Sequence, residues 1–161
     1  MIRNRYLFGI FILVAMTLAW STVLGQETIK IDMDDYKFVP DTVYIPAGEE
    51  ITLQFVNIGT VEHEFMAGRQ VNSDFTGYEI DLFADVDVKK EKSKVMKKPA
   101  VPAPEKPRQP GVALTLLPAQ SGSMSFTLPK DKTGEWEMSC FIPLGEMTHY
   151  HAGMKGIVMV E

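Results

Sequence analysis

Short stretches in which apolar and polar residues alternate recur along this chain, and they predict β-strands. The clearest is 51–55, where Ile51, Leu53 and Phe55 alternate with polar residues and a turn at 57–59 follows. A period of two is typical of a strand with one buried face. Several short strands separated by turns predict an all-β fold, either a sandwich or a barrel. The other predicted strands are residues 28–38, 40–48, 61–67, 112–117, 123–128, 135–140 and 157–161.

The first residues of the chain predict an export signal. Two arginines precede an uncharged apolar run over residues 6–20, and small and polar residues follow it. This order is typical of a secretory signal peptide, here residues 1–25, which is cleaved from the mature protein. The alternative is an uncleaved N-terminal anchor, because residues 6–24 supply 19 residues against the ~20 that span a bilayer. We therefore expect a periplasmic or extracellular domain over residues 26–161, which contacts a membrane only if the segment is retained.

The charge and the cysteine count of the remaining chain exclude some classes of function. Without residues 1–25, the chain has 14 basic and 21 acidic residues and a net charge of −7. This balance argues against a nucleic-acid partner, because such a partner needs a basic face. The single cysteine, Cys140, cannot form an internal disulfide. It is a buried bystander, an intermolecular link or a reactive ligand.

One long stretch interrupts the strand pattern. Residues 69–110 lie between two predicted strands, and 42 residues are too many for a plain connection in a compact domain. Residues 75–88 are apolar enough to pack against the domain. Residues 89–110 carry five prolines, eight basic residues and two acids, so we expect a flexible loop there. It is either a solvated linker or a docking element for an acidic partner or an anionic membrane surface.

One loop and one distant histidine hold the residues that can bind a metal. Cys140, His149, His151 and Met154 lie between the last two predicted strands, and His63 is the only other histidine. Soft sulfur combined with imidazole is a ligand set that copper accepts in both oxidation states, and two histidines, one cysteine and a long axial methionine define the blue-copper electron-transfer site. Taken singly, each of these residues can be explained without a metal. Taken together, they predict a copper site.

Several segments of the chain resemble the cupredoxin family. Residues 38–57 are similar to its second and third strands, residues 63–65 to its first ligand strand, and residues 134–140 to its penultimate strand. The step of five residues from His149 to Met154 is also the usual spacing of the family's last two ligands.

The resemblance implies a Greek-key β-sandwich that binds one copper ion through His63, Cys140, His149 and Met154. It implies a mononuclear type 1 copper protein that carries one electron at a time, and not an enzyme. The expected partners are redox proteins such as cytochromes or oxidases, and the expected state is a monomer. His149 is preferred to His151, which would shorten the step to Met154, and it is the ligand expected nearest the surface.

Two departures from the family pattern leave alternatives open. Cys140 and His149 are nine residues apart, a longer step than the family usually has, so residues 144–147 must bulge outward. Glu64 stands where the family often has an asparagine that forms a hydrogen bond near the cysteine sulfur. A carboxylate such as Glu64 or Glu146 beside an open copper would favour an enzyme similar to the red copper proteins. A copper chaperone or storage protein, which uses clustered methionines and histidines, is the other alternative.

Overall fold

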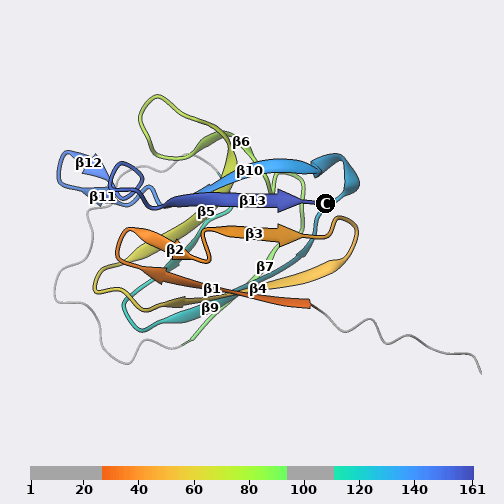
Figure 1. Cartoon of the computed structure of the whole chain (residues 1–161), viewed down its shortest axis with the longest axis horizontal. Helices are drawn as coiled ribbons and strands as arrows, with labels where there is room; N and C mark the ends of the chain where they lie inside the picture. Colours follow the sequence, from red (N-terminus) through yellow and green to blue (C-terminus); the bar gives the residue numbers. More distant parts are fainter. Residues whose placement is uncertain (1–26, 94–110) are drawn as a thin grey trace, which may run out of the picture.

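The computed structural model describes residues 27–93 and 111–161, whose strands form two sheets packed face to face (Figure 1). The first sheet has the strand order β2 (Lys37–Val39), β1 (Glu27–Asp34), β4 (Glu50–Asn57), β9 (Ser121–Thr127) and β7 (Lys89–Lys92). The second sheet has the order β3 (Thr42–Ile45), β13 (Lys155–Val160), β10 (Gly134–Ser139), β5 (His63–Val71) and β6 (Tyr78–Asp81), and β8 (Leu114–Leu116) also pairs with β5. A separate hairpin is formed by β11 (Pro143–Leu144) and β12 (Met147–Thr148).

The described residues contain no α-helix, and η1 (Lys130–Lys132) is a short 3-10 helix. The strand pairs β1–β4 and β3–β13 are parallel, and the remaining pairs are antiparallel. The predicted all-β sandwich is therefore confirmed.

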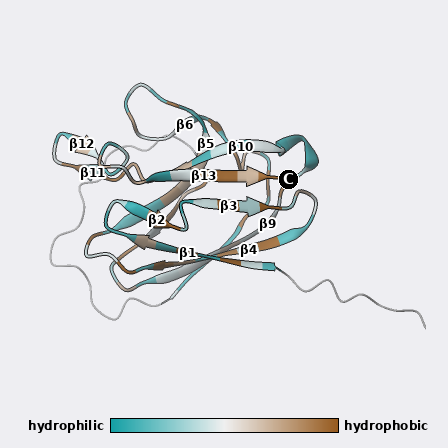
Figure 2. Ribbon diagram, in the orientation of Figure 1, coloured by the Kyte–Doolittle hydropathy of each residue, from teal (hydrophilic) through white to brown (hydrophobic). Residues whose placement is uncertain are grey.

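The alternating pattern of β4 places its apolar side chains in the core between the sheets. Ile51, Leu53 and Phe55 are at most 1% exposed. The parallel neighbour β1 brings Ile31 opposite Phe55, and the ring of Phe55 lies 4.7 Å from that of Phe65 on β5. The burial pattern of β4 alternates along the strand, and the strands in Figure 2 carry both hydrophobic (brown) and hydrophilic (teal) residues. Since each buried side chain of this kind stabilises the fold by about 1.5–3 kcal/mol, this pattern fixes which face of β4 turns inward.

Within the stretch 69–110, the described residues 69–93 contain strands that the sequence analysis did not predict. β5 continues to Val71 and pairs with β6, so the stretch begins inside a strand and contains another. The expectation of a flexible loop over residues 89–110 is wrong for its first four residues, which form β7 on the edge of the first sheet. Backbone hydrogen bonds to β9 need no apolar side chains, and lysines are a common feature of edge strands. The rest of that expectation, residues 94–110, lies outside the described residues.

The predicted export signal, residues 1–25, also lies outside the described residues. Among the residues that are described, no helix has the length and apolar character needed to cross a membrane.

The strand order brings distant segments together at one end of the sandwich. Cys140 directly follows β10, which is antiparallel to β5 with Ser139 opposite Met66. Because antiparallel neighbours run in opposite directions, the start of β5, where His63 lies, is at the same end as Cys140. The β1–β2 turn and the β11–β12 hairpin are at this end too, and the C-terminus is at the other (Figure 1).

Candidate metal centre

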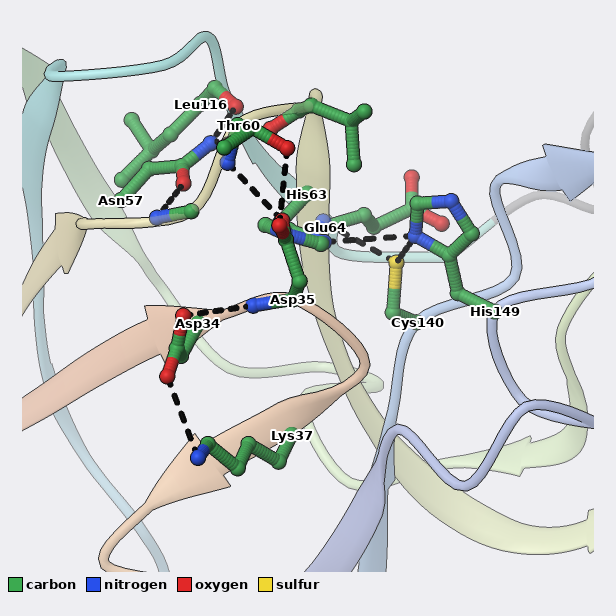
Figure 3. A network of polar contacts seen from close by, with 12 residues as sticks. Asp34, Asp35, Lys37, Asn57, Thr60, His63, Glu64, Leu116, Cys140 and His149 are labelled. Carbon is green, nitrogen blue, oxygen red and sulfur yellow. Dashed lines mark hydrogen bonds and ion pairs between the residues drawn. The ribbon is translucent and has the colours of Figure 1, made fainter.

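Three of the predicted ligands meet in a buried cluster. Nδ1 of His63 lies 3.2 Å from Nδ1 of His149, which lies 3.4 Å from Sγ of Cys140 (Figure 3). The donor atoms of the three residues all lie within 4.8 Å of one another. His63 and Cys140 are 0% exposed and His149 is 2% exposed. Two donors bonded to one ion at about 2.0–2.3 Å lie about 3–4 Å apart, so the cluster fits a single metal ion.

Burial keeps both imidazoles neutral. Burial, and then the neighbouring His63, lower the pKa of His149 to about 4. Burial also lowers the pKa of His63, although Asp35 opposes this shift. Neutral imidazole is the form that binds a metal. Both rings are therefore in the binding form near pH 7.

A buried asparagine shapes the turn that precedes His63. The Asn57 side-chain amide donates to the carbonyls of Val61 at 2.8 Å and of Leu116 at 2.9 Å. Its side-chain carbonyl accepts the Gly59 N–H at 2.9 Å. With all of its donors and its acceptor used, Asn57 fixes the turn at the end of β4 to β8, and this turn leads directly into β5. The turn that leads into His63 is thus held by the hydrogen bonds of Asn57, both within the turn and to β8.

Asp35, which the sequence analysis did not identify, contacts His63 from the side of the ring away from the cluster. Its Oδ1 lies 3.2 Å from Nε2 of His63. Thr60 holds the same carboxylate with two hydrogen bonds of 2.8 Å, from its backbone N–H and from its hydroxyl. These bonds are the main reason why the pKa of Asp35 is lowered. A Cβ at Gly59 would lie 2.5 Å from Oδ1 of Asp35 and 2.7 Å from Nε2 of His63, so only glycine leaves room for this contact.

The Cys140 sulfur accepts a hydrogen bond from the protein backbone. The Glu64 N–H donates to Sγ at 3.3 Å, and the Cys140 N–H donates to the Met154 carbonyl at 3.1 Å. Glu64, which stands where the family often has an asparagine, therefore still supplies a hydrogen bond to the Cys140 sulfur. The donor is a main-chain group, which residue 64 supplies whatever its side chain is.

The residues from His149 to Met154 form one helical turn that ends at a glycine. The Met154 N–H donates to the His149 carbonyl, and the Gly153 N–H donates to the Tyr150 carbonyl, both at 3.0 Å. Gly153 has a φ of +108°, which glycine adopts without strain. This pair of bonds is a Schellman motif. The motif closes the turn with Met154 five residues after His149. The Met154 side chain is 0% exposed.

His151 is not part of the cluster. Its exposed ring points to its own loop, where Nδ1 lies 3.3 Å from the backbone N of Thr148 and 3.1 Å from its hydroxyl. The ring also packs on Phe75, with centroids 4.3 Å apart. Because the helical turn rotates successive side chains, His149 and His151 diverge, and only His149 reaches the cluster.

The predicted outward bulge between Cys140 and His149 is the β11–β12 hairpin. Leu144 pairs with Met147, and Gly145 turns the chain with a φ of +61°. A hydrogen bond of 2.9 Å from the His149 N–H to the Ile142 carbonyl closes the base of the hairpin. Glu146, a candidate carboxylate for an open copper, is exposed in the turn of this hairpin.

Tyr36 covers the two imidazoles. It lies in the β1–β2 turn, with a φ of +63°, and its ring meets that of His149 edge-on at 5.0 Å and that of His63 at 6.5 Å. His149 is the most exposed of the three clustered residues, as expected, but only at 2%. The residue that shields it comes from a turn that the sequence analysis did not assign to the site.

The chain matches the sequence profile of the cupredoxin-like domain over residues 7–102. It belongs to the cupredoxin-like family. This cupredoxin is 26% identical over 138 residues to the copper-resistant cuproprotein CopI of Rubrivivax gelatinosus, covering 85% of this chain and 68% of that protein. The family and the donor set both fit one copper ion.

Solved structures of other proteins have the same sandwich. This cupredoxin is 26% identical to auracyanin B, with a TM-score of 0.52 over 84% of this chain and 88% of that one. It is 22% identical to the auracyanin of the photosynthetic bacterium Roseiflexus castenholzii, with a TM-score of 0.52 over 84% of this chain and 98% of that one.

Proposed function

We propose that this cupredoxin is an exported type 1 copper protein that carries single electrons between redox partners. His63, Cys140 and His149 would hold the copper, with Met154 as the fourth ligand. The observation that carries the proposal is the buried cluster of one thiol and two imidazoles within 4.8 Å, because this donor set is the one that blue-copper sites use. Bound copper would supply the one-electron redox couple.

The hydrogen bonds around the cluster support electron transfer. Asp35 holds His63, the Glu64 N–H holds the sulfur of Cys140, and the Ile142 carbonyl holds the backbone of His149. Each ligand is therefore fixed by the protein rather than by the metal. A site that is fixed in this way changes little when one electron enters or leaves, which keeps the barrier to transfer low.

The surface beside the site fits a brief encounter with a redox protein such as a cytochrome or an oxidase. Pro143, Leu144 and Tyr150 are partly exposed, and Met147 on the same hairpin is 49% exposed. A small, partly apolar surface suits weak electron-transfer complexes, which bury less than about 1,200 Å². We propose that residues 26–161 act here as a monomeric domain, exported by the N-terminal segment.

The test is a spectrum of the copper-loaded protein. We expect one copper per chain, an intense blue absorption band, the narrow copper hyperfine splitting of a type 1 site by EPR, and reversible one-electron cycling. The apoprotein and a zinc-loaded sample serve as controls, and both should be colourless. A weak or red absorption would contradict the electron-carrier proposal and favour the enzyme alternative.

Met154→Leu is expected to keep the intense band and to raise the reduction potential. A thioether is a weak axial ligand that tunes the potential of such sites, and leucine removes it with little change in volume. A redox titration followed by visible absorption measures the shift. An unchanged potential would contradict the axial role of Met154 and point to Met147 or Glu146.

A second candidate function is copper handling for resistance, which the likeness to CopI supports. The exposed Met147 and His151 are further sulfur and nitrogen groups near the site. Stoichiometry and electron self-exchange separate the two functions. Binding of more than one Cu(I) per chain with slow self-exchange would favour handling, and one copper with fast self-exchange would favour electron transfer.

A further inference from the structure

We propose that Asp35 is a positioning residue for His63 that stabilises Cu(II) relative to Cu(I) and so lowers the reduction potential of the site. The inference rests on the proposed copper ligands. The two ring nitrogens of His63 face different partners. Nδ1 lies 3.2 Å from Nδ1 of His149, and Nε2 lies 3.2 Å from Oδ1 of Asp35 (Figure 3). If Nε2 carries the proton and donates it to the carboxylate, the lone pair of Nδ1 is directed into the cluster.

The contacts of the Asp35 carboxylate serve this hydrogen bond. Thr60 holds one oxygen with its N–H and the other with its hydroxyl, both at 2.8 Å. Gly59 leaves the space in which the carboxylate and the imidazole meet. The Asp35 side chain is 33% exposed, so its place in the turn is not explained by packing in the core. Asp35 thus contacts one nitrogen of His63, and Thr60 and Gly59 from a second turn hold the carboxylate in place and leave room for it.

The negative charge of Asp35 determines in which direction the contact shifts the reduction potential. A carboxylate that accepts the N–H of a metal-binding imidazole makes that imidazole a stronger donor. It also places a negative charge behind the ring, and Cu(II) gains more from both effects than Cu(I) because it carries one more positive charge. Loss of such a partner typically costs 10–100-fold in metal affinity. A tenfold loss confined to Cu(II) corresponds to about 59 mV for a one-electron couple.

Asp35→Asn tests the proposal because it removes the charge and keeps one oxygen as an acceptor for Nε2–H, while its amide can donate to the Thr60 hydroxyl. The matched control is Asp34→Asn, which removes an equal charge from the neighbouring residue. Asp34 pairs with Lys37 at 3.1 Å and accepts the Asp35 N–H at 2.9 Å, a bond that asparagine can retain. Thr60→Val provides a graded variant, because it removes the hydroxyl bond to the carboxylate and leaves the backbone bond. The readouts are the visible spectrum, the reduction potential, the Cu(II) affinity and the unfolding of the apoprotein.

We expect Asp35→Asn to keep the type 1 band, lose at least tenfold in Cu(II) affinity and shift the potential upward. Thr60→Val should shift it less in the same direction, and Asp34→Asn should remain within twofold of the wild type. Equal potentials in Asp35→Asn and wild type, equal shifts in the two Asp→Asn variants, or a loss of apoprotein stability alone would each overturn the proposal. Absence of the type 1 band from the wild type would instead overturn the ligand set on which the proposal rests.

Discussion

Cys140→Ser is expected to abolish the intense visible absorption of the copper-loaded protein. The colour of a type 1 site arises from charge transfer between a thiolate and copper, and Cys140 is the only cysteine of the chain. Serine has nearly the same size, so the sandwich should remain folded although a buried sulfur is lost. Absorption and EPR spectra after copper loading measure the effect, and circular dichroism confirms the fold.

A sulfur control strengthens this experiment. Met147→Leu removes an exposed thioether from the hairpin between Cys140 and His149 and should leave the band unchanged. A Cys140→Ser protein that stays strongly coloured would refute the copper–thiolate assignment. A Met147→Leu protein that loses its colour would show that the hairpin, and not only its base, forms part of the site.

His149→Gly is expected to lose the type 1 spectrum, and His151→Gly is expected to retain it. His149 lies in the cluster with its Nδ1 3.4 Å from the Cys140 sulfur, whereas the ring of His151 packs on Phe75 at the surface. Glycine at position 149 would open a hole the size of an imidazole directly beside the metal. Visible spectra of the two variants, recorded with equal copper, measure the difference.

Added imidazole provides the internal control for this pair. It should enter the hole in His149→Gly and restore the type 1 band, because the rest of the site is held by His63 and Cys140. It should leave His151→Gly unchanged. Loss of the band in His151→Gly, with rescue by imidazole, would move the ligand assignment by two residues and contradict the geometry of the helical turn.

The core and the clustered ligands were predictable from the sequence because both depend on local patterns. Alternation at 51–55 fixes a strand and its buried face, and the bulkiest residues of that strand are the most buried. Cys140 and His149 lie in one loop, and His63 is the only histidine outside it. For a metal that needs sulfur and nitrogen donors, the chain offers few other combinations.

The residues around the ligands were not predictable because they are placed by pairing between distant segments. Asp35 and Tyr36 fall inside the stretch 28–38, which the sequence predicts as one strand but which forms two strands and a tight turn. Their partner His63 lies 28 residues beyond Asp35, and no local pattern records that distance. β7 was missed for another reason: its residues, Lys89–Lys92, are held by main-chain hydrogen bonds and carry no apolar signal.

The hairpin between Cys140 and His149 shows that separation along the sequence differs from separation in space. Along the chain these residues are nine apart, but the hydrogen bond between Ile142 and His149 closes the base of the hairpin, so the residues at the base set where the two proposed ligands lie. We therefore expect a change in the length of the hairpin tip to leave the positions of Cys140 and His149 unchanged. A search pattern that requires a short cysteine-to-histidine interval would overlook this chain, although the closed base of its loop still brings Cys140 and His149 together.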